Sequence, residues 1–192
     1  MTILVLFHTR HFRDLKSFYL GYVCQHMKKE FPHTVSYNRF VERQAQVGLH
    51  LLLFLQTCAL GKCTGISIID STPLVSCHIK RMHMHKTMKG WAAKGKCTMG
   101  WFYGFKLHLV IKIKKNMKNS LMNLYDKLML RKRSVIETVN DELKNVCQIE
   151  HTRHRSIDNF ATNLFARLIA YNLLPKKPSM NMEIIDKSRL ID

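Results

Sequence analysis

The sequence has few acidic side chains, and they are unevenly spread along it. Its 192 residues hold 13 Asp and Glu against 31 Lys and Arg, which gives a formal net charge of +18 at pH 7. Between Asp70 and Glu137 there is only one other acid, Asp126. A charge excess of this size concerns partners rather than fold, and it favours a polyanion. We therefore expect DNA or RNA as the partner, ahead of an anionic membrane surface, with an affinity that falls as salt is added.

Paired cysteines and long hydrophobic runs are also missing. The six cysteines form no CxxC motif and no disulfide framework, which predicts reduced thiols in a cytosolic protein. The apolar run at 49–60 contains His50 and Gln56 and is too short to span a bilayer. Residues 1–7 are apolar but lack the basic n-region of a signal peptide. We expect a cytoplasmic protein with no membrane partner.

What is present is enough apolar sequence for one ordinary domain, since 46% of the residues are hydrophobic. Apolar positions spaced by three and four predict helices through residues 1–62, with a break at Pro32 and a long helix over 37–58. The β-branched run at 66–70 and the alternating run at 101–113 predict strands.

Helical spacing returns from Ser120 to Pro175, with Ser134 and Ser156 as the expected N-caps of two helices. Two or three strands among helices predict an α/β fold. The expected division of the chain is an N-terminal helical region at 1–62, an α/β domain at 63–175 and a C-terminal tail at 176–192.

Asp70 follows a run of apolar residues, and the pattern predicts that it lies at the carboxyl end of a strand. Ligands and metals bind at such ends in open α/β sheets, so Asp70 is a candidate metal ligand. The alternative is a turn residue, because Asp-Ser-Thr-Pro at 70–73 is favourable turn chemistry. Both interpretations are open at this point.

Glu137 lies in a second pattern, with Arg133 four residues before it and Lys144 seven residues after it. On a helix all three share nearly one face. A carboxylate that holds a metal, flanked by two cations that hold phosphates, is suited to cutting DNA. The alternative is a solvated helix with ordinary ion pairs, for which Asp141 and Glu142 are also available. Two-metal chemistry usually requires a third acid, and the sequence offers no good candidate.

Two other groups of residues have simpler interpretations. Four Cys and His side chains lack the regular spacing of known zinc sites, and we interpret them as part of a basic loop near DNA: Cys77, His78, His83 and His85. Four aromatic side chains can stack on bases, but core packing is the favoured interpretation: Trp101, Phe102, Tyr103 and Phe105.

Five blocks of the sequence together resemble bacterial insertion-sequence DDE transposases, specifically the insertion sequence 982 family. They are 68–74 (IIDSTPL), 77–81 (CHIKR), 100–108 (GWFYGFKLH), 131–145 (RKRSVIETVNDELKN) and 148–156 (QIEHTRHRS). The resemblance implies a ribonuclease-H-like core whose Asp, Asp and Glu bind two Mg²⁺ ions for DNA cleavage and strand transfer. It places Asp70 as the first Asp and Glu137 as the Glu, with Arg133 and Lys144 as its basic partners. The implied partner is double-stranded DNA at the element ends, in the bacterial nucleoid.

The family's second catalytic Asp has no counterpart here. In the family, a strand like the one ending near Ile111 is followed by further strands, a helix and the segment that bears this Asp. Here residues 112–119 resemble family sequence beyond it, so we expect a deletion around Ile111–Ile113. Asp126 lies in a helical run and is poorly placed to substitute. The abrupt start at Met1 also resembles the interior of the family's helical region.

We therefore expect an internally deleted and N-terminally shortened transposase with an incomplete ribonuclease-H-like core of two or three strands. Only Asp70 and Glu137 remain as metal ligands, so we expect catalysis to be lost and Mg²⁺ to be weakly held. Missing strands also leave a sheet edge and apolar faces uncovered. The alternative function is a non-catalytic DNA-binding protein that inhibits full-length transposase, as a homo-oligomer or in mixed oligomers. An unrelated RNA-associated protein is disfavoured by the five blocks.

Overall fold

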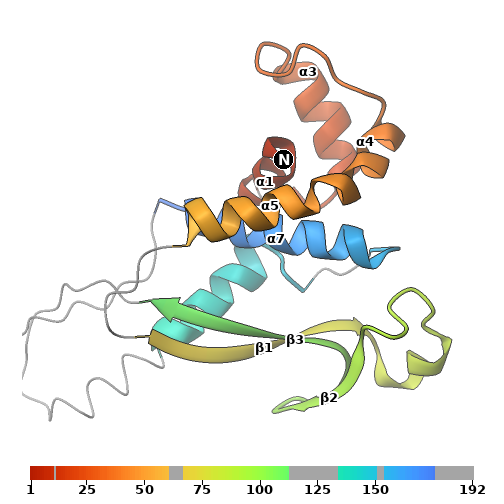
Figure 1. The fold of residues 1–192 in the computed structure, drawn as a ribbon, viewed down its shortest axis with the longest axis vertical. Coiled ribbons are helices and arrows are strands. Elements are labelled where there is room, and N and C mark those ends of the chain that lie inside the picture. Colours follow the sequence, from red (N-terminus) through yellow and green to blue (C-terminus); the bar gives the residue numbers. More distant parts are fainter. Residues whose placement is uncertain (11, 61–66, 113–133, 151–153, 176–192) are drawn as a thin grey trace, which may run out of the picture.

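The computed structural model describes residues 1–10, 12–60, 67–112, 134–150 and 154–175. Its N-terminal helices and its sheet lie on opposite sides of the molecule (Figure 1). The N-terminal helices make the upper layer, and a small sheet makes the lower one. Two later helices lie between these layers: residues 134–146 and α7 (Ile157–Leu173). None of the helices in the described ranges is long and apolar enough to span a membrane.

The N-terminal layer consists of three helical stretches; the break near Pro32 was predicted, whereas the break between Thr9 and Leu15 was not. Asp14 and Ser36 cap the second and third, each accepting a hydrogen bond from a backbone N–H three residues on. The first is α1 (Thr2–Thr9), the second runs through α2 (Leu15–Ser17), η1 (Phe18–Val23) and α3 (Cys24–His26), and the third through α4 (Tyr37–Gln44), η2 (Ala45–Val47), α5 (Gly48–Phe54) and η3 (Leu55–Ala59). The helix predicted over 37–58 is confirmed.

The sheet has three antiparallel strands in the order β1-β3-β2. They are β1 (Ser67–Cys77), β2 (Ala93–Cys97) and β3 (Gly100–Lys112), and a short 3₁₀ helix, η4 (Ile79–Met84), follows β1. At Gly104 a Cβ atom would collide with the backbone of Leu74, so only glycine allows β1 and β3 to approach this closely. Mixed helices and a small sheet agree with a partial α/β fold at the level of fold class.

The prediction that Asp70 ends a strand is wrong, and so is the alternative that it belongs to a turn. β1 continues for seven residues beyond Asp70 and includes Pro73. Proline lacks the N–H that a central strand needs, but β1 has β3 on one side only within the described sheet. Thr72 and Leu74 are buried on either side of Pro73, and this burial holds the segment extended.

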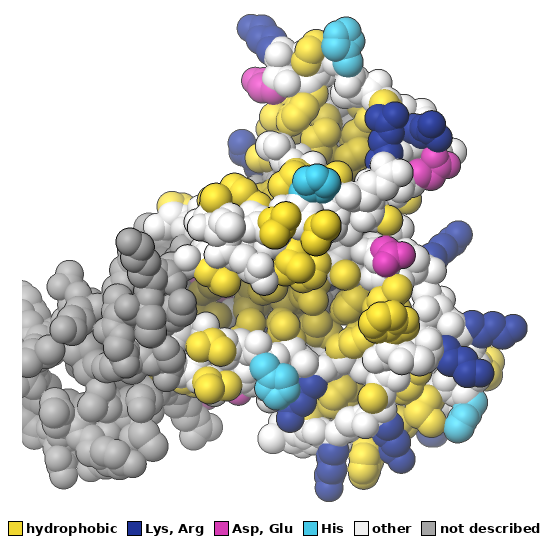
Figure 2. Space-filling view, in the orientation of Figure 1, with side chains coloured by type: hydrophobic (Ala, Val, Ile, Leu, Met, Phe, Trp, Pro, Cys, Tyr) yellow, Lys and Arg dark blue, Asp and Glu magenta, His cyan; other side chains and the backbone are white. Residues whose placement is uncertain are grey.

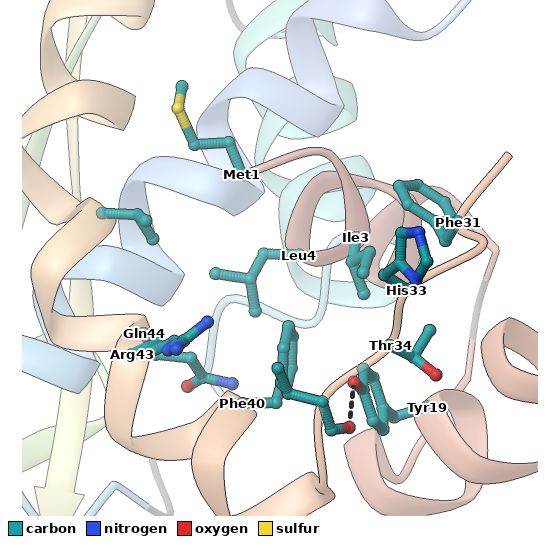
Figure 3. Close-up of a pocket in the computed structure, with 12 residues that line it drawn as sticks. Met1, Ile3, Leu4, Tyr19, Phe31, His33, Thr34, Phe40, Arg43 and Gln44 are labelled. Atoms are coloured by element: carbon teal, nitrogen blue, oxygen red, sulfur yellow. Dashed lines mark hydrogen bonds between the residues drawn. The ribbon is translucent and has the colours of Figure 1, made fainter.

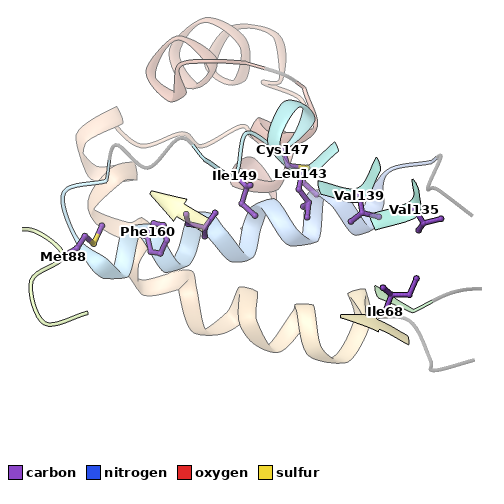
Figure 4. Packing of buried hydrophobic residues seen from close by; sticks show 10 residues of the cluster. Ile68, Met88, Val135, Val139, Leu143, Cys147, Ile149 and Phe160 are labelled. Atoms are coloured by element: carbon purple, nitrogen blue, oxygen red, sulfur yellow. The ribbon is translucent and has the colours of Figure 1, made fainter. Parts of the chain in front are cut away.

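A core cluster joins the sheet to the two middle helices (Figure 4). Val135, Val139 and Leu143 follow one another along helix 134–146 and are buried. They pack in one cluster with residues of β1, α7 and the loop after η4: Ile68, Leu74, Met88, Phe160 and Ala170. α7 also contributes Ala166 and Ile169 to a second cluster with α1 and α5. α7 therefore connects the N-terminal layer to the rest of the chain.

Candidate functional site

Asp70 lies on the face of the sheet that the middle helices cover. It pairs with Leu109 of β3, and Leu109 packs against the core cluster. Its neighbour Ile69 pairs with Val110 on the opposite face, where these two side chains are 70% and 58% exposed. Because successive side chains of a strand alternate between faces, the apolar residues around Asp70 fix its direction toward the helices.

Asn140 of helix 134–146 connects that helix to Asp70. Its Nδ2 donates a hydrogen bond of 2.6 Å to Oδ2 of Asp70, across 70 residues of sequence. Glu137 lies three residues before Asn140, so both are on neighbouring positions of one helical face. The structure thus brings the helix that carries Glu137 directly over the strand that carries Asp70. Asp70 is half-buried there, and Glu137 is exposed.

The two predicted basic residues have different outcomes. Lys144 lies two turns beyond Glu137, and its Nζ forms an ion pair of 2.9 Å with Oε1 of Glu150. Both side chains of this pair remain partly exposed, so the pair adds little to stability. Arg133 lies outside the described residues, as does Asp126, so their predicted places stay predictions.

The described residues do not provide a complete metal site. They contain no group of three or more His, Cys, Asp or Glu side chains that could hold an ion. Carboxylates such as Asp70 and Glu137 suit Mg²⁺ chemically, but two of them leave most of an octahedral shell unfilled. Glu142 on the same helix does not form such a group with them. Burial and then Asp141 raise the pKa of its carboxyl group, and burial followed by Glu142 raises the pKa of Tyr171 in α7 to about 12.

Sequence reasoning missed a buried polar cluster between α1 and α7. Burial, followed by the charge of Arg167, lowers the pKa of His8 to about 3 and that of His154 to about 4. Burial also lowers the pKa of Arg167 to about 10, and its Nη1 donates 3.1 Å to the carbonyl oxygen of Ile149. Asn163 acts in the opposite direction and raises the pKa of His8. The sequence around His8 is basic and gives no signal that this side chain is buried.

A cavity of about 220 Å³ lies in the N-terminal layer, between α1, the loop at 31–35 and α4 (Figure 3). The hydroxyl of Tyr19 donates 2.6 Å to the carbonyl oxygen of Val35 at its wall. The lining is mainly apolar, with Arg43 and Gln44 as its longest polar side chains and with no carboxylate. His33 is the one imidazole in this lining, and with no carboxylate beside it the cavity offers no set of metal or acid–base groups that competes with Asp70 as a candidate site.

The segment between Asp70 and the end of β3 is uniformly basic. From Ser71 to Ile111 the sequence has no Asp or Glu, and all seven of its Lys and Arg side chains are exposed: Lys80, Arg81, Lys86, Lys89, Lys94, Lys96 and Lys106. Lys and Arg side chains gather around the end of the sheet that carries η4 and β2 (Figure 2, lower right). Positive charge that no neighbouring acid offsets suits a phosphate backbone.

Comparison with protein families finds a match to a family model described as a transposase DDE domain. It matches residues 60–114 and 110–157, which together cover just over half of the chain. The two matched segments meet at residues 110–114, where β3 ends. Comparisons with curated proteins and with solved structures find no match.

Proposed function

This chain belongs to the transposase DDE domain family, and we propose that it is an internally deleted transposase of the insertion sequence 982 type that binds DNA without cleaving it. The observation that carries this proposal is the contact between Asp70 and helix 134–146. In this proposal Asp70 and Glu137 are the first and last acids of a DDE site, and the contact supports it by bringing the helix of Glu137 over Asp70, while the described residues offer no third acid beside them.

The two matched segments support a deletion. They meet at residues 110–114, and the sequence places the expected junction at Ile111–Ile113. A chain that had lost an internal piece would match its family in two segments that adjoin at the junction. Within the described ranges, a sheet of three antiparallel strands with β1 paired on one side only is what an incomplete ribonuclease-H-like core would leave.

The residues present fit a metal site in part. Two Mg²⁺ ions, when bound in a complete site, activate water or a DNA 3′-hydroxyl for in-line attack on a phosphodiester. Here Asp70 and Glu137 would hold such an ion, and Arg133 and Lys144 would hold phosphates. Asp70 is meanwhile held by the amide of Asn140, and Lys144 by Glu150. These contacts preserve the arrangement of the site without supplying the missing acid.

DNA binding rests on the exposed Lys and Arg side chains between Ser71 and Ile111. We propose double-stranded DNA at the element ends as the partner. A protein that occupies these ends without cutting them would inhibit full-length transposase, either alone or in mixed oligomers.

The experiment is a binding titration with duplex DNA that carries the terminal repeats of the element. Between 50 and 200 mM salt the affinity should fall by roughly 10³- to 10⁵-fold if the protein contacts about six to ten phosphates. A parallel Mn²⁺ titration of the wild-type protein should give the same weak binding as Asp70→Ala. Salt-independent DNA binding, or tight Mn²⁺ binding that Asp70→Ala abolishes, would contradict the proposal.

A further inference from the structure

The hairpin of β2 and β3 exposes one large aromatic side chain among lysines. Three of the four aromatic residues at 101–105 are in or against the core, as favoured from the sequence, but Trp101 is 56% exposed. Nζ of Lys94 lies 4.5 Å from the centroid of the Trp101 ring, and Nζ of Lys96 lies 5.8 Å from it. Both lysines come from β2, where Lys96 pairs directly with Trp101.

This arrangement has a defined chemistry. An indole ring with an exposed surface offers a stacking platform for any nucleic-acid base, because every base has a π-face. The two ammonium groups lie over the ring and are attracted to it, which keeps them close to any phosphate that flanks a base stacked on the indole. The nearest acidic residues in the sequence are far from this hairpin, since none occurs from Ser71 to Ile111. The surface is therefore complementary to a strand that carries both exposed bases and phosphates.

We propose that Trp101, Lys94 and Lys96 form a binding site for single-stranded DNA, in which an unpaired base stacks on the indole. This inference rests on the proposed function as a DNA-binding protein and adds to it a site that prefers unpaired bases. In a duplex the faces of internal bases are covered by their neighbours, so a platform like Trp101 has a partner only where bases are unpaired. Lysines without an exposed aromatic ring would bind the phosphates of duplex and of single-stranded DNA alike.

The chain is suited to a direct test because it has two tryptophans, Trp91 and Trp101. Trp91 is 69% exposed, so Trp91→Phe is expected to fold and leaves Trp101 as the one fluorescent indole. Short oligothymidylate should quench this signal as it binds. In the wild-type background Trp101→Ala should weaken binding by roughly five- to a hundredfold, and Trp101→Phe should restore most of the affinity.

Matched controls separate stacking from charge. Trp91→Ala removes an exposed indole outside the hairpin and should leave the affinity within about twofold of wild type. Lys94→Ala and Lys96→Ala should each reduce the slope of log affinity against log salt by about 0.7 while the quenching at saturation persists. Far-UV circular dichroism and the thermal midpoint should be unchanged in every variant, since all these side chains are exposed.

The outcomes distinguish this proposal from the one on which it rests. If the protein binds duplex DNA but Trp101 is not quenched and Trp101→Ala binds oligothymidylate normally, the hairpin site is wrong and the proposed function stands. If neither duplex nor single strand binds, both are wrong. Oligouridylate that binds more tightly than oligothymidylate would also overturn the assignment to DNA.

Discussion

At the scale of single residues, the candidate site depends on one hydrogen bond. The amide of Asn140 satisfies the half-buried carboxylate of Asp70 and fixes helix 134–146 over β1. The sequence predicted Asp70 and Glu137 as candidate metal ligands, because an acid after an apolar run and an acid on an amphipathic helix are recognisable patterns. It did not find Asn140, since a polar residue three positions from Glu137 is ordinary on any helix.

Replacing Asn140 should therefore weaken the contact between strand and helix. Asn140→Ala should reduce the free energy of unfolding by about 1–2 kcal/mol, because it leaves the Asp70 carboxylate partly buried without its donor. The matched control is Asn145→Ala, which removes an exposed Asn–Asp contact four residues apart on the same helix and should cost less than about 0.5 kcal/mol. Urea unfolding measures both, and equal losses would contradict the role given to Asn140.

The buried histidines predict how stability depends on pH. In the folded chain the pKa values of His8 and His154 are about 3 and about 4, whereas an unfolded histidine titrates near 6.5. The contribution of these two histidines to the free energy of unfolding is fully present above pH 6.5, where neither the folded nor the unfolded state protonates them. As the pH falls below 6.5, these histidines become protonated in the unfolded state while they stay neutral in the folded state. Each histidine then removes roughly 1.4 kcal/mol of stability per pH unit until its folded pKa is reached.

Denaturant unfolding between pH 7.5 and 5 checks this expectation. His8→Gln and His154→Gln should each make the decline in stability shallower. His50→Gln is the control, since His50 is exposed and in contact with water in both states. A wild-type protein whose stability does not change over this range would show that the two histidines are not buried.

At the scale of elements, periodicity predicted the helices more closely than the strands. The long helix over 37–58 and the N-cap at Ser156 follow from apolar spacing and local side-chain chemistry, whereas the N-cap at Ser36 was not predicted. β1 was predicted too short because Pro73 normally ends a strand, and its persistence depends on pairing on one side and on burial of its neighbours. β2 was missed because Ala-Lys-Gly-Lys-Cys has little β propensity and pairs through its contact with β3.

Helix 134–146 is held by packing, and its removal from the sheet would separate Glu137 from Asp70. Leu143→Ala should reduce the free energy of unfolding by about 2–5 kcal/mol, because this fully buried side chain lies in the cluster shared with β1 and α7. Leu53→Ala makes the same chemical change on α5, where the side chain is about half exposed, and should cost less than about 1 kcal/mol. Thermal or urea unfolding of the two variants gives the comparison, and similar costs would argue against the packing described.

At the scale of the whole molecule, the proposal of a deleted, DNA-binding transposase rests on the basic charge and on the exposed face of the sheet. The exposed Lys and Arg side chains between Ser71 and Ile111 carry part of the net charge of +18, and no acid lies among them in the sequence, which suits the proposed DNA partner. The sheet meanwhile exposes Ile69 and Val110 on its open face, as expected for a core that lacks covering elements. Both properties are visible in the sequence as composition and as the gap between Asp70 and Glu137. The direct contact from Asp70 to the Glu137 helix is not, because it spans 70 residues.

The most direct test of this account is a strand-cleavage assay on duplex DNA that carries the element ends, with Mg²⁺ or Mn²⁺ and a full-length relative as the positive control. The account predicts that the wild-type chain binds this DNA in a salt-sensitive way and gives no more cleavage product than Asp70→Ala. Metal-dependent cleavage by the wild-type chain that both Asp70→Ala and Glu137→Ala abolish would contradict it.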